Sequence, residues 1–230
     1  MRFRPIVLIA CLAALSIAHA GAAPLKATYL APSPGVPSIS VELKAAPDMA
    51  SYATAARARC EAFYPKAVKY LATEGYTAPT EFTFVFQERT GVAETTGLTI
   101  SFAAPYFRQN PTDYGAAIHE MVHVIQGFPN NQPVWLTEGM TDYVRFYMYE
   151  PVSRRPHPTP RPDTYRRSYQ DTAAFLAWAQ AKYNKNLVRD LNAAFRESRY
   201  SDRLWVTETG KELDALGAEF YQFMLAQPKQ

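Results

Sequence analysis

The stretch NPTDYGAAIHEMVHVIQG, residues 110–127, decides how the rest of this chain is interpreted. Asn110 is a favourable cap and Pro111 a favourable first helical residue, so the sequence predicts a helix that begins there. Asp113 adds an acidic side chain to the first turn, where it interacts well with the helix dipole. Gly127 predicts the end of the helix, because glycine readily adopts the left-handed conformation that follows a helix.

Two histidines of this predicted helix, His119 and His123, are four residues apart. Their imidazoles therefore project from the same face, one turn apart, which lets both bind one Zn²⁺. Glu120 lies about 100° round the helix from His119, where it can reach a water on the metal and act as the general base. The chain has only four histidines, so a pair at this spacing favours a metal site over two unrelated side chains.

The third protein ligand must come from another segment, and Glu138 is the best candidate. It lies near the start of a second predicted helix, which opens at Gln132-Pro133 and ends before Pro151. Asp142 follows at i+4 on the same face, where it can accept a hydrogen bond from a zinc-bound histidine and fix its tautomer. If Glu138 is not the ligand, Asp142 is the alternative. Two histidines, one carboxylate and a water describe an open, catalytic zinc site.

The remaining patterns predict strands first and helices afterwards, which indicates an α+β fold. The predicted strands are 38–43, 81–87 and 98–102, and the predicted helices are 48–74, 168–183, 186–196 and 210–224, with a short turn near 202–206. Residues 151–162 hold five prolines and are predicted to form an extended loop. Thr209 and Glu212 form a capping box ahead of the last helix. Strand 98–102 is predicted to be the sheet edge, to which an extended substrate could add by backbone hydrogen bonds.

The N-terminus has the pattern of a cleavable export signal. Arg2 and Arg4 precede an apolar run, and Ala18-His19-Ala20 then gives a small-x-small site, so we expect residues 1–20 to be a signal peptide. A flexible leader is expected over 21–37 and a single domain over 38–230, with lobes 38–127 and 128–230. We therefore expect a secreted or periplasmic protein, with no stable membrane insertion after signal cleavage. The net charge of +3 and the absence of a basic run with interleaved aromatics argue against nucleic acid as a partner.

The motif and its surroundings resemble one known family. HEMVHVIQ (119–126) followed by WLTEGMTDYVR (135–145) is similar to the basic secretory protein family of plants and bacteria. The resemblance runs over residues 38–224 and includes APDMASYATAARARCEAFYPKAVKYLATEGY (46–76), GVAETTGLTISFAAPYFRQNPTDYG (91–115) and SYQDTAAFLAWAQAKY (168–183). It implies a zincin-like metallopeptidase domain, with a small mixed sheet and the active-site helix first and a helical lobe afterwards.

By that resemblance His119 and His123 are metal ligands and Glu120 is the catalytic acid/base, while Glu138 as third ligand follows from the gluzincin pattern. The expected activity is hydrolysis of peptides or proteins by a Zn²⁺-activated water, with Glu120 taking the proton and later delivering it to the leaving amine. The oxyanion also needs a donor. Tyr169 is the first candidate for that donor and Tyr143 the second.

Two other functions are compatible with the same residues. One is a zinc-containing binding or defence-type protein with little hydrolysis, although the carboxylate of Glu120 would have no use in a purely structural site. The other is a zinc amidase that acts on cell-wall peptides. The substrates that are cut, and the loss of cutting in Glu120→Ala, would distinguish these functions.

Overall fold

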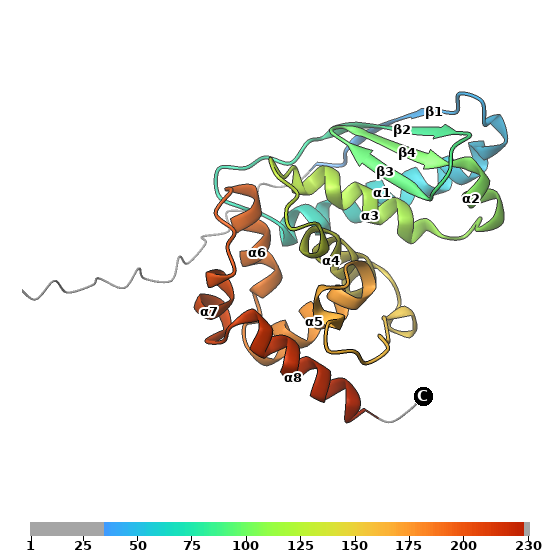
Figure 1. The fold of residues 1–230 in the computed structure, drawn as a ribbon. Coiled ribbons are helices and arrows are strands. Elements are labelled where there is room, and N and C mark those ends of the chain that lie inside the picture. Colours follow the sequence, from blue (N-terminus) through green and yellow to red (C-terminus); the bar gives the residue numbers. More distant parts are fainter. Residues whose placement is uncertain (1–34, 228–230) are drawn as a thin grey trace, which may run out of the picture.

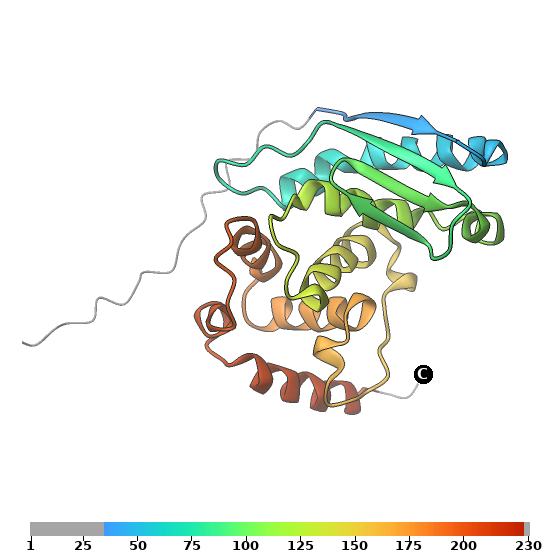
Figure 2. The same ribbon diagram turned by 45° about the horizontal axis from the view of Figure 1, so that its top comes forward.

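A four-stranded mixed sheet lies on one side of the protein, and the helices lie beneath it (Figure 1). The computed structural model describes residues 35–227. The strands are β1 (Ser38–Glu42), β2 (Glu81–Gln87), β3 (Ala93–Thr96) and β4 (Thr99–Ala103). Their order is β1-β2-β4-β3, with β2 parallel to β1 and β4, and β3 antiparallel to β4. In Figure 2, β1 and β3 lie at opposite edges of the sheet.

Alternating phenylalanines attach the sheet to the helix layer. Phe82, Phe84 and Phe86 of β2 are buried on one face, as expected for a strand with period-two patterning. From α1 (Ala50–Tyr70), the Tyr52 ring lies 5.9 Å from Phe86 and the Tyr64 ring 6.2 Å from Phe82, measured between ring centroids. The predicted strand 81–87 is confirmed, and its apolar face forms the core above α1.

The edge strand on the side of the histidines is β3, and the prediction that 98–102 forms this edge is wrong. Those residues form β4, which pairs on both sides, with β2 and β3. β3 and β4 are joined by a two-residue turn whose first residue, Gly97, has a φ of 58°, a conformation that glycine adopts without strain. The short sequence Ala93–Thr96 between two glycines has the composition of a loop, and only pairing with β4 makes it a strand.

The histidine-bearing helix is α3 (Tyr114–Gln126), which begins three residues later than predicted. Asn110 instead ends the short helix α2 (Ala104–Gln109), because a residue that precedes proline is disfavoured in the helical conformation. The cap of α3 is Asp113, whose Oδ1 accepts a hydrogen bond of 3.2 Å from the Ala116 amide. Gly127 ends the helix with a φ of 52°, as predicted.

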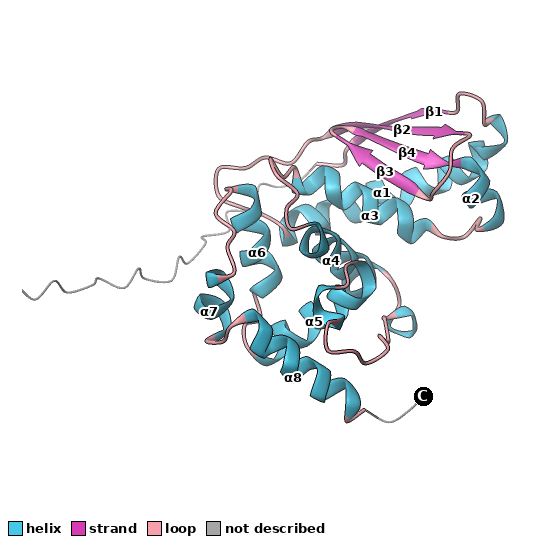
Figure 3. Ribbon diagram, viewed as in Figure 1, coloured by secondary structure: helices cyan, strands magenta, loops and turns pink. Residues whose placement is uncertain are grey.

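Strands are confined to the first half of the described chain, and the second half is helical (Figure 3). The later helices are α4 (Val134–Val144), α5 (Tyr169–Lys182), α6 (Leu187–Arg196), α7 (Arg203–Thr209) and α8 (Leu213–Leu225). A π-helical turn (Arg145–Tyr149) continues α4, and short 3₁₀ turns lie at Pro47–Met49, Val152–Arg154 and Thr164–Arg166. The α+β class with a small mixed sheet is therefore confirmed.

The predicted capping box before the last helix is wrong. Thr209 belongs to α7, and its hydroxyl donates to the Trp205 carbonyl oxygen at 2.6 Å. Glu212 is the N-cap residue of α8. The cause is that α7 extends through Thr209 and ends at Gly210, which has a φ of 75°, so only a short link remains before α8.

A partly buried arginine joins the two halves of the structure. Arg196 of α6 donates to the carbonyl oxygens of Leu71, Ile125 and Gln126 at 2.8 to 3.0 Å, which lie at the ends of α1 and α3. Burial lowers the pKa of its guanidinium to about 10, and the ring of Tyr76 lies 3.8 Å from the guanidinium carbon. A cation is stabilised at these helix ends by the negative pole of each helix dipole.

The predicted signal peptide over residues 1–20 lies outside the described residues, and so does most of the predicted leader. Within residues 35–227, none of the helices has the length and apolar character that crossing a membrane requires.

Candidate metal centre

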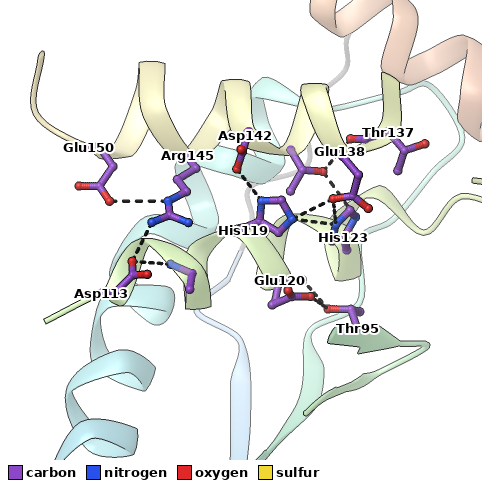
Figure 4. A network of polar contacts seen from close by, with 12 residues as sticks. Thr95, Asp113, His119, Glu120, His123, Thr137, Glu138, Asp142, Arg145 and Glu150 are labelled. Carbon is purple, nitrogen blue, oxygen red and sulfur yellow. Dashed lines mark hydrogen bonds and ion pairs between the residues drawn. The ribbon is translucent and has the colours of Figure 1, made fainter. Parts of the chain in front are cut away.

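Three ligand atoms from α3 and α4 converge at one point (Figure 4). His119 Nε2 lies 3.2 Å from His123 Nε2 and 3.1 Å from Glu138 Oε2, and His123 Nε2 lies 3.3 Å from the same carboxylate oxygen. A tetrahedral zinc ion with ligand bonds of 2.0 to 2.1 Å has ligand atoms about 3.3 Å apart. Both the donor set and its spacing therefore fit Zn²⁺, and Glu138 is the carboxylate that joins the two histidines.

Asp142 holds His119 from the opposite side of the ring. Its Oδ1 lies 2.7 Å from His119 Nδ1, a distance typical of a charge-assisted hydrogen bond. Donation from Nδ1–H to Asp142 turns Nε2 toward Glu138 and His123, and Nε2 is then the ring nitrogen that a metal would bind in place of a proton. Asp142 thus contacts the side of His119 away from the converging atoms, whereas Glu138 is the carboxylate that groups with the two histidines.

The carboxylates around the imidazoles favour positive charge at the centre. Burial lowers the pKa of His119, but its hydrogen bonds to the carboxylates of Asp142 and Glu138 outweigh burial and raise the pKa to about 10. Burial raises the pKa of Glu138, but the two histidines outweigh it and lower the pKa to about 2. Three carboxylates surround this point, counting Glu120, so a divalent cation would be electrostatically favoured there.

Glu120 is held beside the histidines by the edge strand. The hydroxyl of Thr95, on β3, lies 2.7 Å from Glu120 Oε2. Glu120 is buried, with 7% of its surface exposed, and it borders a cavity of about 630 Å³ that also contains the three converging residues. A carboxylate in this place can exchange a proton with a molecule bound at the centre.

Tyr169 lies over the same cavity. Its ring centroid is 6.1 Å from that of His119 and nearly parallel to it, and 55% of Tyr169 is exposed. The helix α5, which carries Tyr169, packs closely on α4 at Gly139. A Cβ at Gly139 would lie 2.2 Å from Thr172 Cγ2 of α5, so glycine is what permits this approach. Ser168 and Tyr169 have φ values of 72° and 45°, which are uncommon for residues other than glycine and often occur at functional sites.

Tyr143 faces away from the centre, although it is adjacent to Asp142. Its ring stacks on Tyr70 and Tyr147, and its hydroxyl accepts a hydrogen bond of 2.6 Å from Gln180 Nε2. It does not border the cavity around Glu120. The structure therefore leaves Tyr169 as the candidate oxyanion donor.

Arg145 closes the other end of the cavity. Its Nη2 donates to Asp113 Oδ1 at 2.7 Å, and Glu150 Oε1 lies 3.8 Å from its Nε. Because Asp113 also caps α3, this ion pair fixes the start of α3 against the end of α4. Polar contacts therefore connect α3 and α4 at two places beside the centre, through His119 with Asp142 and through Asp113 with Arg145.

A family model described as "Peptidase of plants and bacteria", the BSP family, matches residues 33–220. The chain belongs to this family. The match spans the four strands, α1 to α7 and every residue of the metal centre. No curated protein and no solved structure matches the chain. The peptidase family to which the chain belongs agrees with the peptide or protein substrates expected from the sequence.

Three residues around the centre of this BSP-family protein were not predicted: Thr95, Gln126 and Thr141. Gln126 follows His123 by three residues on the same helix, so the spacing that relates the histidines could have indicated it. Thr141 lies three residues after Glu138 and could have been found in the same way. Thr95 could not, because its contact with Glu120 depends on a strand that the sequence did not indicate.

Proposed function

We propose that this BSP-family protein is a zinc-dependent peptidase of the zincin-like, gluzincin type. The observation that carries the proposal is the convergence of His119 Nε2, His123 Nε2 and Glu138 Oε2 within 3.3 Å of one another, with Glu120 in the same cavity. Two histidines and one carboxylate leave a fourth position open, which distinguishes catalytic zinc sites from structural ones. The family assignment supports peptides or proteins as the substrates.

Bound zinc would supply Lewis acidity and a water of lowered pKa. Glu120 acts as the general base, taking the proton of the attacking water and later passing it to the leaving amine. The Thr95 hydroxyl, 2.7 Å from Glu120 Oε2, restricts the carboxylate to one orientation. The buried position of Glu120 reduces competition from bulk solvent during both transfers.

Tyr169 donates to the oxyanion that develops on the substrate carbonyl. Burial and the nearby carboxylates of Glu138, Glu120 and Asp142 raise the pKa of its phenol, so the phenol keeps its proton at neutral pH. A protonated donor that faces the reacting carbonyl stabilises the transition state more than the ground state. Its exposure to the cavity leaves the hydroxyl free to meet a substrate.

The substrate backbone pairs with β3. This strand has an unpaired edge, and Ala93, Glu94 and Thr95 border the cavity that contains the metal centre. An extended peptide there can add as a further strand by main-chain hydrogen bonds. The same strand would thus position both the substrate and, through Thr95, the general base.

We further propose that the protein acts outside the cytoplasm. The basic and apolar start of the chain and the Ala18-His19-Ala20 site support this location. N-terminal sequencing of the exported protein should begin at Gly21. A purified protein that retains Met1 after expression in an export-competent host would contradict this part of the proposal.

The test is cleavage of a mixed peptide library by the exported protein, with and without zinc, beside Glu120→Ala. Zinc-dependent cleavage that is lost in the variant, while the variant still binds zinc, would support the peptidase. Stoichiometric zinc binding without cleavage would replace it with a binding role, and cleavage confined to cell-wall peptides would indicate the amidase. Failure of the wild-type protein to bind zinc would end the zinc proposal altogether.

A further inference from the structure

The two histidines of the centre have unlike partners at Nδ1. His119 meets the carboxylate of Asp142, whereas His123 Nδ1 lies 3.1 Å from the amide oxygen Oε1 of Gln126. Gln126 is 1% exposed and lies one turn beyond His123 on α3. One imidazole is therefore held by an anion and the other by a neutral group.

A second helix adds to the contacts of the Gln126 amide. The hydroxyl of Thr141, on α4, is fully buried and lies 3.1 Å from the same Oε1, 3.0 Å from the Thr137 carbonyl oxygen and 3.4 Å from His123 Nδ1. Its single proton can be donated to either oxygen, and Oε1 faces His123 Nδ1 in either case. Nδ1 of His123 then carries the proton, and the lone pair of Nε2 is directed at Glu138 Oε2, 3.3 Å away.

This orientation has an energetic cost. Nε2 of Gln126 is buried and has no hydrogen-bond partner, and leaving a buried amide donor unpaired is destabilising. A side chain that only filled space at this position would be more stable as methionine, which has similar length and no polar atoms. The amide is thus better explained by its contact with His123 than by packing.

We propose that Gln126 is a positioning residue for the metal centre, whose amide oxygen holds His123 in the Nδ1–H tautomer that directs Nε2 at the metal. The inference rests on the proposed zinc site. The neutrality of the Gln126 amide also matters, because Glu120, Glu138 and Asp142 already place three carboxylates at the centre. A fourth anion would lower the net charge of the zinc-loaded centre and weaken its Lewis acidity.

Zinc affinity separates this role from a structural one. We would titrate the purified exported protein with zinc against a chromogenic chelator, comparing wild type, Gln126→Met and Gln126→Glu. Gln126→Met should bind zinc about 10- to 100-fold more weakly, while its metal-free form unfolds at the same urea concentration as wild type or a higher one. Gln126→Glu, which restores an acceptor, should bind zinc as tightly as wild type or more tightly.

Asn192 provides a matched control. It is a fully buried amide on α6 that donates to the Leu71 carbonyl oxygen at 3.1 Å and does not contact either histidine. Asn192→Leu should lower stability and leave zinc affinity unchanged. The tautomer can be read directly from long-range ¹H–¹⁵N correlations of the imidazole of His123 in the zinc-free protein.

Any of three results would overturn the inference. The first is that Gln126→Met binds zinc as tightly as wild type, and the second is that Gln126→Glu binds zinc as weakly as Gln126→Met. The third is that, in the absence of zinc, His123 carries its proton at Nε2 in both wild type and Gln126→Met. It is distinguished from failure of the proposed function by the wild-type titration. A wild type that binds no zinc refutes the metal site, whereas a wild type that binds zinc and a variant that binds equally refutes only the role of Gln126.

Discussion

Two hollows of the described structure show that size and chemical character need not go together. The groove between α5, α8 and the proline-rich loop has a volume of about 1730 Å³ and is lined mainly by aromatic and aliphatic side chains, including Trp178 and Phe223. The cleft over α3 measures about 630 Å³ and is lined by carboxylates and imidazoles. Within residues 35–227, the group of side chains suited to a metal lies in the cleft.

A large apolar hollow is the usual starting hypothesis for a ligand site, and a search on that basis would select the groove. The difference teaches that convergence of charged groups identifies the reactive site better than volume does. If this is correct, substitutions in the cleft should change chemistry with little effect on stability. Substitutions around the groove should leave chemistry unchanged.

The largest effect is expected from Tyr169→Phe, which removes one hydroxyl from the cleft and keeps the ring against His119. Loss of an oxyanion donor lowers kcat by about 10²- to 10³-fold, and KM should change little because the donor acts in the transition state. Steady-state kinetics on the best library peptide measure both. Equal kcat values for Tyr169→Phe and wild type would show that Tyr169 is not the oxyanion donor. They would also reduce the expected difference between substitutions in the cleft and in the groove.

Asp142→Asn should weaken zinc binding about 10-fold or more, because it replaces the anionic partner of His119 Nδ1 with a neutral one. Competition with a chelator measures the affinity. Glu219→Gln is the control, since this carboxylate borders the groove and pairs with Lys182 and Lys211. If both variants bind zinc like wild type, the charge of the cleft does not hold the metal.

Glu208→Gln tests a titrating group outside both hollows. Burial, and then Asp190, raise the pKa of Glu208 to about 7, above its value in the unfolded chain. The stabilisation from protonated Glu208 is therefore complete below about pH 4.5 and is lost as pH rises through 7. After allowance for solvent screening of this partly exposed group, the loss should be about 1–2 kcal/mol.

Urea unfolding of the metal-free protein between pH 4.5 and pH 8 measures a pH dependence to which His119, with its pKa raised to about 10, also contributes. The difference between wild type and Glu208→Gln isolates the contribution of Glu208, and the stability of wild type relative to the variant should fall as pH rises through 7. Zinc affinity and turnover should be the same in both proteins at any one pH. A difference in stability that does not change with pH would show that Glu208 is not the titrating group.

The smallest effect is expected from Phe223→Ser in the groove. Phe223 is 44% exposed and contacts the rings of Trp178 and Phe220, so its removal should cost about 0.5 kcal/mol of stability. Turnover and zinc affinity should equal those of wild type. A lowered kcat in Phe223→Ser would contradict the distinction between the two hollows, because it would show that the groove takes part in the reaction.

What the sequence predicted correctly was carried by local spacing. His119 and His123 lie on one face of α3, and Glu138 and Asp142 lie on one face of α4, because i and i+4 residues of any helix do so. That α4 crosses α3 closely enough to bring Glu138 within 3.3 Å of both histidines depends on packing of the whole core, which spacing does not reveal.

The incorrect predictions concern β3 and the start of α3, where neighbouring elements rather than local spacing decide the structure. β3 was not predicted because its strand character comes from β4, and the contact between Thr95 and Glu120 was missed with it. The start of α3 was misplaced because both Asn110 and Asp113 are good caps. Only the presence of α2 before Asn110, together with Pro111 after it, selects Asp113.

The contacts of Arg196 bear on how the cleft can open. Because this side chain from α6 donates hydrogen bonds to the ends of both α1 and α3, rotation of the C-terminal helices as a rigid body would break several partly buried hydrogen bonds at once. A hinge between the lobes is therefore costly. The β3–β4 hairpin, whose edge strand lies between Gly91 and Gly97 with φ values of 88° and 58°, is the less constrained wall. Substrate entry and product release by the proposed peptidase would then require this hairpin to move, and its movement would also break the contacts of Thr95 with Glu120.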